Sequence, residues 1–171
     1  MHVNVLVISG SMGSGKTTVL GEVSDLLSAR RISHAIIDLD AMAAVGLSKE
    51  AAAELSRRNL SAIYSHFIAA GLRHLLLAVA VETRAQLETL REAMPGANLV
   101  VCRLTASVPT MEQRLRVREP GIQQERFVAR AGELERLLEA AAVEAFTVNN
   151  DDRSVTDVAR DVLSRAGWPA G

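Results

Sequence analysis

The chain has 171 residues, a length that favours one domain spanning residues 1–171. Hydrophobic residues make up 49% and charged residues 23%, as is typical of water-soluble globular proteins. The formal net charge is −1, so no overall basic field attracts nucleic acid or an anionic membrane. This composition argues against those two partners and leaves a local basic patch as the open alternative.

The sequence also carries compartment signals. There is one cysteine, Cys102, so an internal disulfide cannot form. No apolar stretch is long enough to cross a bilayer, and the N-terminal apolar run lacks the basic leader of a signal peptide. We therefore expect a cytoplasmic protein that is a monomer or a homodimer.

Short apolar runs alternate along the chain with longer segments of helical periodicity. The apolar runs predict strands at residues 3–9, 34–38, 74–80, 98–104 and 145–150. Helical spacing predicts helices at residues 17–30, 48–71, 83–93, 109–118, 124–143 and 154–166. The apolar side of the second helix is expected to hold Leu55, Ile63, Phe67 and Ile68. This alternation predicts an α/β fold whose parallel sheet carries helices on both faces.

The turn after the first strand has the spacing of a phosphate-binding P-loop. Gly10 is followed by four residues and then by Gly15, Lys16 and Thr17, between a strand and a helix. Glycines allow a tight loop whose amides approach phosphate oxygens, and the helix N-terminus adds its dipole. Lys16 is expected to reach the phosphates and Thr17 to bind Mg²⁺. The expected ATP-binding residues in this loop are Gly10, Ser11, Met12, Gly13, Ser14, Gly15, Lys16, Thr17 and Thr18.

Two acidic residues end the second strand. Asp38 and Asp40 lie one residue apart in the segment IIDLDAM, where both can overhang the phosphate site. A phosphotransferase needs a carboxylate near Mg²⁺ and another to accept the proton of the acceptor hydroxyl. We expect Asp38 to serve the metal and Asp40 to act as the base and contact the substrate. An acidic turn in which Asp40 caps a helix remains the alternative.

An arginine-rich helix precedes a Pro-Gly break at residues 120–121. Arg114 and Arg118 lie four residues apart, hence on one helix face, while Arg116 points elsewhere. Guanidinium groups that close over a transferring phosphoryl group stabilise its charge. We expect residues 114–130 to form a short lid in which Arg114 and Arg118 are catalytic. The alternative is a solvated helix whose arginines pair with neighbouring glutamates.

These three features together resemble the small P-loop kinases of metabolites and nucleosides. That group includes gluconate kinase, shikimate kinase, adenylylsulfate kinase and chloramphenicol phosphotransferase. The resemblance implies a three-layer P-loop fold with strand order 2-3-1-4-5, a requirement for ATP and Mg²⁺, and transfer to a small acceptor. Two departures keep the acceptor open. Gly121-Ile122 stands where the gluconate kinase lid has His-Phe, and Ala43 stands where adenylylsulfate kinases have Arg.

The remaining site predictions concern the acceptor and the adenine. Arg57, Arg58 and Arg130 are candidates for holding an anionic acceptor, because an arginine fork matches a carboxylate or phosphate. Glu82 is a candidate for supporting a metal-bound water or an acceptor hydroxyl. Asn150 ends the last predicted strand, and the resemblance places the adenine near the turn that follows.

The predicted function is ATP-dependent transfer of the γ-phosphate to a hydroxyl or phosphate of a small metabolite, nucleoside or nucleotide. The chain lacks the Asn/Thr-Lys-x-Asp motif of GTPases and the Asp-Glu strand end of ring ATPases, which argues against both classes. Two alternatives remain open: an ATP-binding regulatory protein with little turnover, and a kinase of polynucleotide 5′-hydroxyl ends.

Overall fold

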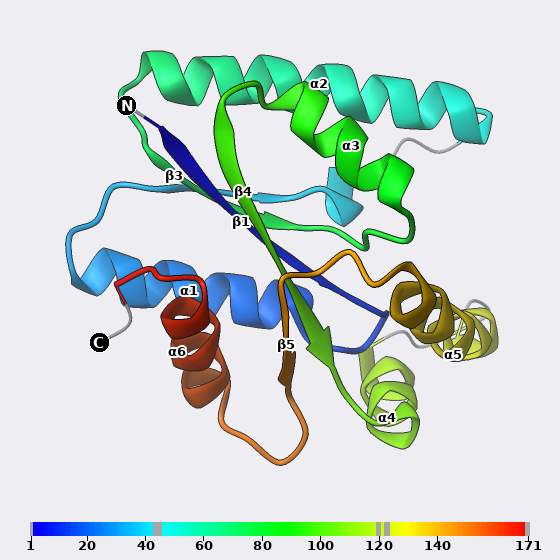
Figure 1. The fold of residues 1–171 in the computed structure, drawn as a ribbon. Coiled ribbons are helices and arrows are strands. Elements are labelled where there is room, and N and C mark those ends of the chain that lie inside the picture. Colours follow the sequence, from blue (N-terminus) through cyan, green and yellow to red (C-terminus); the bar gives the residue numbers. More distant parts are fainter. Residues whose placement is uncertain (1, 43–45, 119–120, 122–123, 170–171) are drawn as a thin grey trace.

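The computed structural model of the chain describes residues 2–42, 46–118, 121 and 124–169. Strands and helices alternate along it, as predicted (Figure 1). The strands are β1 Val3–Gly10, β2 Ala35–Asp38, β3 His74–Ala78, β4 Ala97–Thr105 and β5 Phe146–Asn149. The helices are α1 Lys16–Ala29, the short 3₁₀ helix η1 Asp40–Met42, α2 Lys49–Ala69, α3 Arg84–Ala93, α4 Val108–Arg118, α5 Gln124–Ala141 and α6 Val155–Arg165.

The strands form one sheet in the order β2-β3-β1-β4-β5, and every neighbouring pair is parallel. Both the α/β class and the strand order implied by the resemblance are confirmed. Because the strands run in one direction, their carboxyl ends meet along one edge of the sheet. The P-loop and the Asp38–Asp40 turn therefore lie at the same edge.

Successive side chains of β1 point to opposite faces of the sheet, and each face has its own hydrophobic core. Val5 and Val7 belong to the core beneath α2 and α3, whereas Leu6 and Ile8 belong to the core beneath α1 and α6. All four side chains are fully buried, and burying such a side chain stabilises the fold by about 1.5–3 kcal/mol. Figure 1 shows the resulting layers, with α2 and α3 on one side of the sheet and α1 and α6 on the other.

Helix α2 corrects one detail of the sequence analysis. Its buried side chains are Leu60 and Tyr64, four residues apart on one face. Leu55, predicted on the apolar side, is 40% exposed. It precedes Leu60 by five residues, which rotates it about 140° away from the buried face at 3.6 residues per turn.

Helices α4 and α5 lie together beyond the carboxyl end of β1 (Figure 1). Leu115, Val128 and Ala131 join them in a small core, against which Met12 of the P-loop also packs. The predicted lid therefore contacts the phosphate loop directly. Within that lid, residues 119–120 and 122–123 lie outside the described residues, as does Ala43. None of the helices described is long and apolar enough to cross a membrane.

Candidate functional site

The P-loop adopts a backbone conformation that requires glycine. Gly10, Gly13 and Gly15 have φ values of 150°, 81° and 98°, and side chains disfavour this half of conformational space. A Cβ on Gly13 would also lie 2.6 Å from the Met111 carbonyl oxygen of α4. Gly15 caps α1 and no side chain caps this helix terminus. The N–H groups of its first turn are thus not capped by a side chain, as an anion-binding helix terminus requires.

Two side chains from outside the P-loop donate hydrogen bonds to its backbone carbonyls. The Asn150 amide nitrogen donates to the Ser14 carbonyl at 2.7 Å, and Asn150 is buried. The Arg114 guanidinium donates to the carbonyls of Gly13 at 3.3 Å and Asn150 at 2.9 Å. Both residues were predicted to contact the nucleotide or the transferring group. In the structure both side chains contact the loop backbone, and the predicted contacts with a ligand stay predictions.

A third contact ties the loop to α5. The Ser11 hydroxyl donates to the Ala131 carbonyl at 2.7 Å, and this bond is buried. The buried Ser14 hydroxyl, in contrast, has no hydrogen-bond partner among the described residues. An unsatisfied buried hydroxyl is costly, and here it lies in a loop whose spacing matches phosphate binding. The residues present therefore fit a phosphate-bearing ligand.

Lys16 and Asp40 meet in front of the loop. The Lys16 ammonium lies 3.2 Å from an Asp40 carboxylate oxygen and donates to the Gly10 carbonyl at 3.1 Å. The Lys16 side chain is 11% exposed and that of Asp40 is 44% exposed. The carboxylate of Asp40 is thus open to a molecule that approaches from solvent, while the ammonium is positioned between it and the loop.

Thr17 and Asp38 form a second pair beside the first. The Thr17 hydroxyl donates to one Asp38 carboxylate oxygen at 2.7 Å, and the Ala41 N–H donates to the other at 3.2 Å. Mg²⁺ is usually held by one or two carboxylates together with phosphate oxygens and waters. This hydroxyl and carboxylate are suitable ligands. No group of three His, Cys, Asp or Glu side chains in the described part of the chain could hold a metal alone.

Lys16 and Asp40 line one wall of a large cleft between α2, α5 and the carboxyl edge of the sheet. Its volume is about 1290 Å³, whereas a single small-molecule pocket is typically about 300–1,000 Å³. Lys16 and Asp40 lie in the cleft with Met12, and Arg118 and Arg126 line it from α4 and α5. The cleft can therefore hold the phosphates of a nucleotide together with a second molecule.

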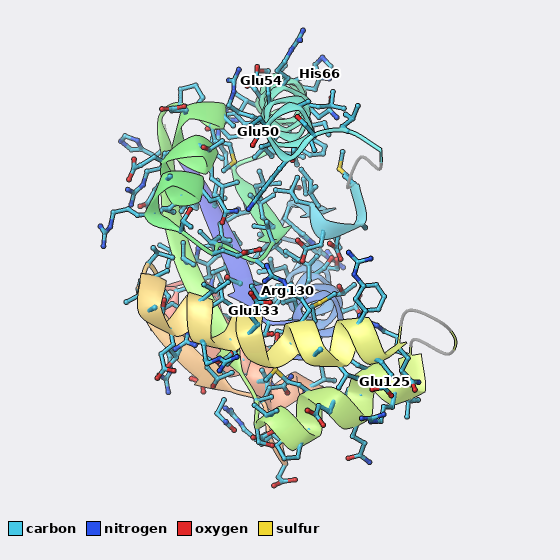
Figure 2. The ribbon with its side chains drawn as sticks, turned by 90° about the vertical axis from the view of Figure 1, so that its right-hand side faces the viewer. Glu50, Glu54, His66, Glu125, Arg130 and Glu133 are labelled. Atoms are coloured by element: carbon cyan, nitrogen blue, oxygen red, sulfur yellow. The ribbon has the colours of Figure 1, made fainter. Side chains whose placement is uncertain are left out.

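Arg130 bridges α5 to the end of β3. Its guanidinium lies 3.1 Å from Glu82 and 2.8 Å from Glu133. The hydrogen bond to Glu133, together with Glu82, holds the pKa of Arg130 above its usual value. Figure 2 shows Arg130 and Glu133 on the side of α5 turned toward α2. The prediction that Arg130 lies at the cleft agrees with this placement, but two carboxylates already neutralise it.

The structure separates the two arginines of α2. Arg57 is held by Glu54 through two hydrogen bonds of 2.8 and 2.7 Å and borders a smaller cavity beside the cleft. Arg58 is exposed and lines neither space. Thr18, predicted to contact the nucleotide, is exposed on the first turn of α1 next to Thr17.

Sequence reasoning missed several residues of the cleft. Ser56 and Gln86 line both the cleft and the smaller cavity. The Ser9 hydroxyl accepts a hydrogen bond from the Val81 N–H at 3.1 Å and fixes the segment after β3. Only Gln86 has a sequence signal, since it forms a capping box with Thr83 at the start of α3. That signal marks a helix terminus and says nothing of a binding site.

Comparisons with known proteins were made at the levels of sequence and structure. No protein-family model matches the sequence, and no curated protein matches it either. Among solved structures, a gluconokinase from Sinorhizobium meliloti 1021 is 20% identical, covers 96% of this chain and 91% of its own, and has a TM-score of 0.65. An APS kinase from Mycobacterium tuberculosis, in complex with AMPPNP and APS, is 21% identical over 95% of this chain and 96% of its own, with a TM-score of 0.64.

A tunicamycin resistance protein from Deinococcus radiodurans is 17% identical, covers 98% of both chains and has a TM-score of 0.69. A sugar kinase and a shikimate kinase are also similar in structure. At these identities the likeness concerns the fold. The chain has the fold of the small P-loop kinases, the group that its P-loop, acidic turn and arginine helix resemble.

Proposed function

We propose that the protein transfers the γ-phosphate of ATP to a hydroxyl group of a small molecule. The observation that carries this proposal is the contact between Lys16 and Asp40 at one wall of a cleft large enough for two ligands. The ammonium is at the P-loop and the carboxylate is open to the cleft, so a phosphate and an acceptor hydroxyl can meet between them. The kinase fold of the structural neighbours supports the same conclusion.

The roles follow from the positions. The loop amides, Gly10 to Thr18, would hold the phosphates of ATP, with Lys16 balancing their charge. Thr17 and Asp38 would hold Mg²⁺, which neutralises phosphate charge when it is bound. Asp40 would accept the proton of the acceptor hydroxyl. As it does so, the hydroxyl oxygen of the acceptor forms a bond to the γ-phosphorus, and the bond between the γ-phosphorus and the β–γ bridging oxygen breaks. ADP leaves with that bridging oxygen.

The arginines divide into two groups in this proposal. Arg118 lines the cleft and would stabilise charge on the transferring group. Arg114 contacts the loop carbonyl of Gly13 and would position the loop. Arg114 is thus a positioning residue, and its substitution should raise the KM for ATP more than it lowers kcat.

The experiment is a transfer assay with ATP labelled at the γ-phosphate. The purified protein is incubated with Mg²⁺, labelled ATP and, in separate reactions, a panel of hydroxyl compounds and a polynucleotide with a 5′-hydroxyl end. The proposal expects label on a small acceptor and ADP formation that requires it. ATP binding without any acceptor-dependent ADP would indicate a regulatory protein, and label on the polynucleotide alone would indicate the other alternative.

A further inference from the structure

A smaller cavity opens beside the cleft, between α2, α3 and the segment after β3. Its volume is about 180 Å³. Leu39, Ser56, Val79, Ala80 and Gln86 line both the cavity and the cleft, so the two spaces adjoin. Asp40 follows Leu39 directly in the chain and lines the cleft. A molecule with its hydroxyl at Asp40 can therefore extend into this cavity.

The surface of the apolar cavity, as we call this space, is built mainly from aliphatic side chains. Leu60, Val81 and Leu90 are 1%, 1% and 8% exposed, and each lines it. A cavity of about 150 Å³ lined by aliphatic and aromatic side chains stays dry and binds benzene. The volume here thus suits a group of the size of a phenyl ring or a branched alkyl chain.

The polar groups at its border are mostly engaged with the protein. The Gln86 side-chain oxygen accepts hydrogen bonds from the N–H groups of Glu82 at 2.6 Å and Thr83 at 3.2 Å. The Thr89 hydroxyl donates to the Ala85 carbonyl at 3.0 Å. A polyhydroxylated acceptor would find few partners here, and its own hydroxyls would be buried without hydrogen bonds.

Arg57 at the border of this space and Arg130 in the adjoining cleft are both paired with carboxylates. Glu54 accepts two hydrogen bonds from one edge of the Arg57 guanidinium, from Nε and Nη2. Arg130 is bound by Glu82 and Glu133. An anionic acceptor would have to compete with these carboxylates for each arginine. Of the three arginines predicted to hold an anionic acceptor, Arg57 and Arg130 are thus paired with carboxylates, and Arg58 lines neither space.

We infer that the acceptor is an uncharged alcohol whose apolar part, of about phenyl size, occupies the apolar cavity while its hydroxyl lies at Asp40. This inference rests on the proposed function and names the chemical class of its acceptor. It replaces the sequence-based expectation of an anion held by Arg57, Arg58 and Arg130. A hydroxylated acid such as gluconate would bind weakly for the two reasons just given.

The test compares benzyl alcohol with gluconate on the protein loaded with Mg²⁺ and a non-hydrolysable ATP analogue. Binding is measured by ligand-observed NMR titration, which does not depend on turnover. Benzyl alcohol should bind at least tenfold more tightly than gluconate. Equal or tighter binding of gluconate would overturn the inference.

Two variants of α2 locate the binding. Ala53 lines the apolar cavity, so Ala53→Phe should fill it and weaken benzyl alcohol binding at least tenfold. Ala51 is exposed on the same helix and lines neither space, so Ala51→Phe should leave the affinity unchanged. Unchanged affinity of both variants for the ATP analogue shows that each is folded. Benzyl alcohol binding that survives Ala53→Phe would contradict the assignment.

The transfer assay separates this inference from the proposed function. If benzyl alcohol binds in the apolar cavity but neither it nor any other hydroxyl compound takes label from ATP, the proposed function fails and the ligand class stands. If label passes to gluconate and not to benzyl alcohol, the ligand class fails and phosphoryl transfer stands.

Discussion

The two sides of the cleft are built differently. On the P-loop side, the shape is set by backbone held from several elements: Ser11 to α5, Ser14 to Asn150 after β5, and Gly13 to Arg114 of α4. On the α2 side, the shape of the surface is set by side chains of α2, α3 and the segment after β3. Under the proposed function, phosphate binding would depend on a fixed backbone, whereas the choice of acceptor would depend on a few side chains.

The largest expected effect is that of removing Lys16. Lys16→Ala should reduce kcat for transfer about 10³-fold, because a preorganised charge at the transferring group is lost. Lys49 is the only other lysine of the chain and is exposed at the start of α2. Lys49→Ala should leave transfer unchanged. Initial rates with labelled ATP make the comparison, and equal rates for the two variants would remove Lys16 from the mechanism.

Next in size is the substitution of a loop glycine. Gly13→Ala should lower the free energy of unfolding by about 2–3 kcal/mol and abolish ATP binding. The reasons are the cost of a positive φ and the approach of the new Cβ to the Met111 carbonyl. Gly21 has open space around its Cβ position within α1. Gly21→Ala should therefore stabilise the protein by up to about 1 kcal/mol.

Urea denaturation of the two glycine variants, together with ATP titration, measures both effects. A Gly13→Ala protein that keeps its ATP affinity would show that the loop backbone is not the phosphate cradle.

A smaller effect is expected for Asn150. Asn150→Ala leaves the buried Ser14 carbonyl without its donor, which should cost about 1–3 kcal/mol of stability. The KM for ATP should rise because the loop is less well held. Asn149 is exposed and accepts only the local N–H of Asp151 through its side chain. Asn149→Ala is the control, and equal thermal stability and KM in the two variants would contradict the bracing role.

The smallest expected effect concerns Cys102, which is buried in the central sheet below the cleft. Burial raises the pKa of the Cys102 thiol to about 12, whereas an exposed cysteine has a pKa of about 8.5. The folded protein should resist thiol reagents at pH 8 with or without ATP. Above about pH 9 the unfolded chain binds fewer protons than the folded one, so stability should fall with rising pH. Rapid labelling of the native protein would show that the sheet opens.

The contrast between the two sides also decides how much the sequence could predict. The loop conformation and the strand before it agree with the prediction, because glycines at fixed spacing specify a backbone shape and a β-branched run specifies a buried strand. Phosphate binding by the loop stays a prediction. The strand order came from the resemblance, since no local signal sets which strands pair. The position of Asp38 and Asp40 at a strand end predicted that both lie near the P-loop; Asp40 lines the cleft and Asp38 contacts Thr17.

Other parts of the site had no signal of this kind. Arg114 lies four residues from Arg118 on one helix face, but spacing could not show that its guanidinium turns to the loop carbonyl of Gly13. Leu55 was misplaced because the apolar pattern of α2 does not fix which stripe faces the sheet. The apolar cavity arises where α2 and α3 meet, and such a space depends on side-chain packing between distant segments.

The most direct test of the account is the Asp40→Asn variant, measured with an identified acceptor. The account predicts ATP affinity close to that of the unsubstituted protein, because the P-loop is intact, and a fall in kcat of about 10²–10⁴-fold, because the acceptor hydroxyl loses its base. Full transfer activity in Asp40→Asn would contradict the assignment of Asp40 as the base and with it the central claim.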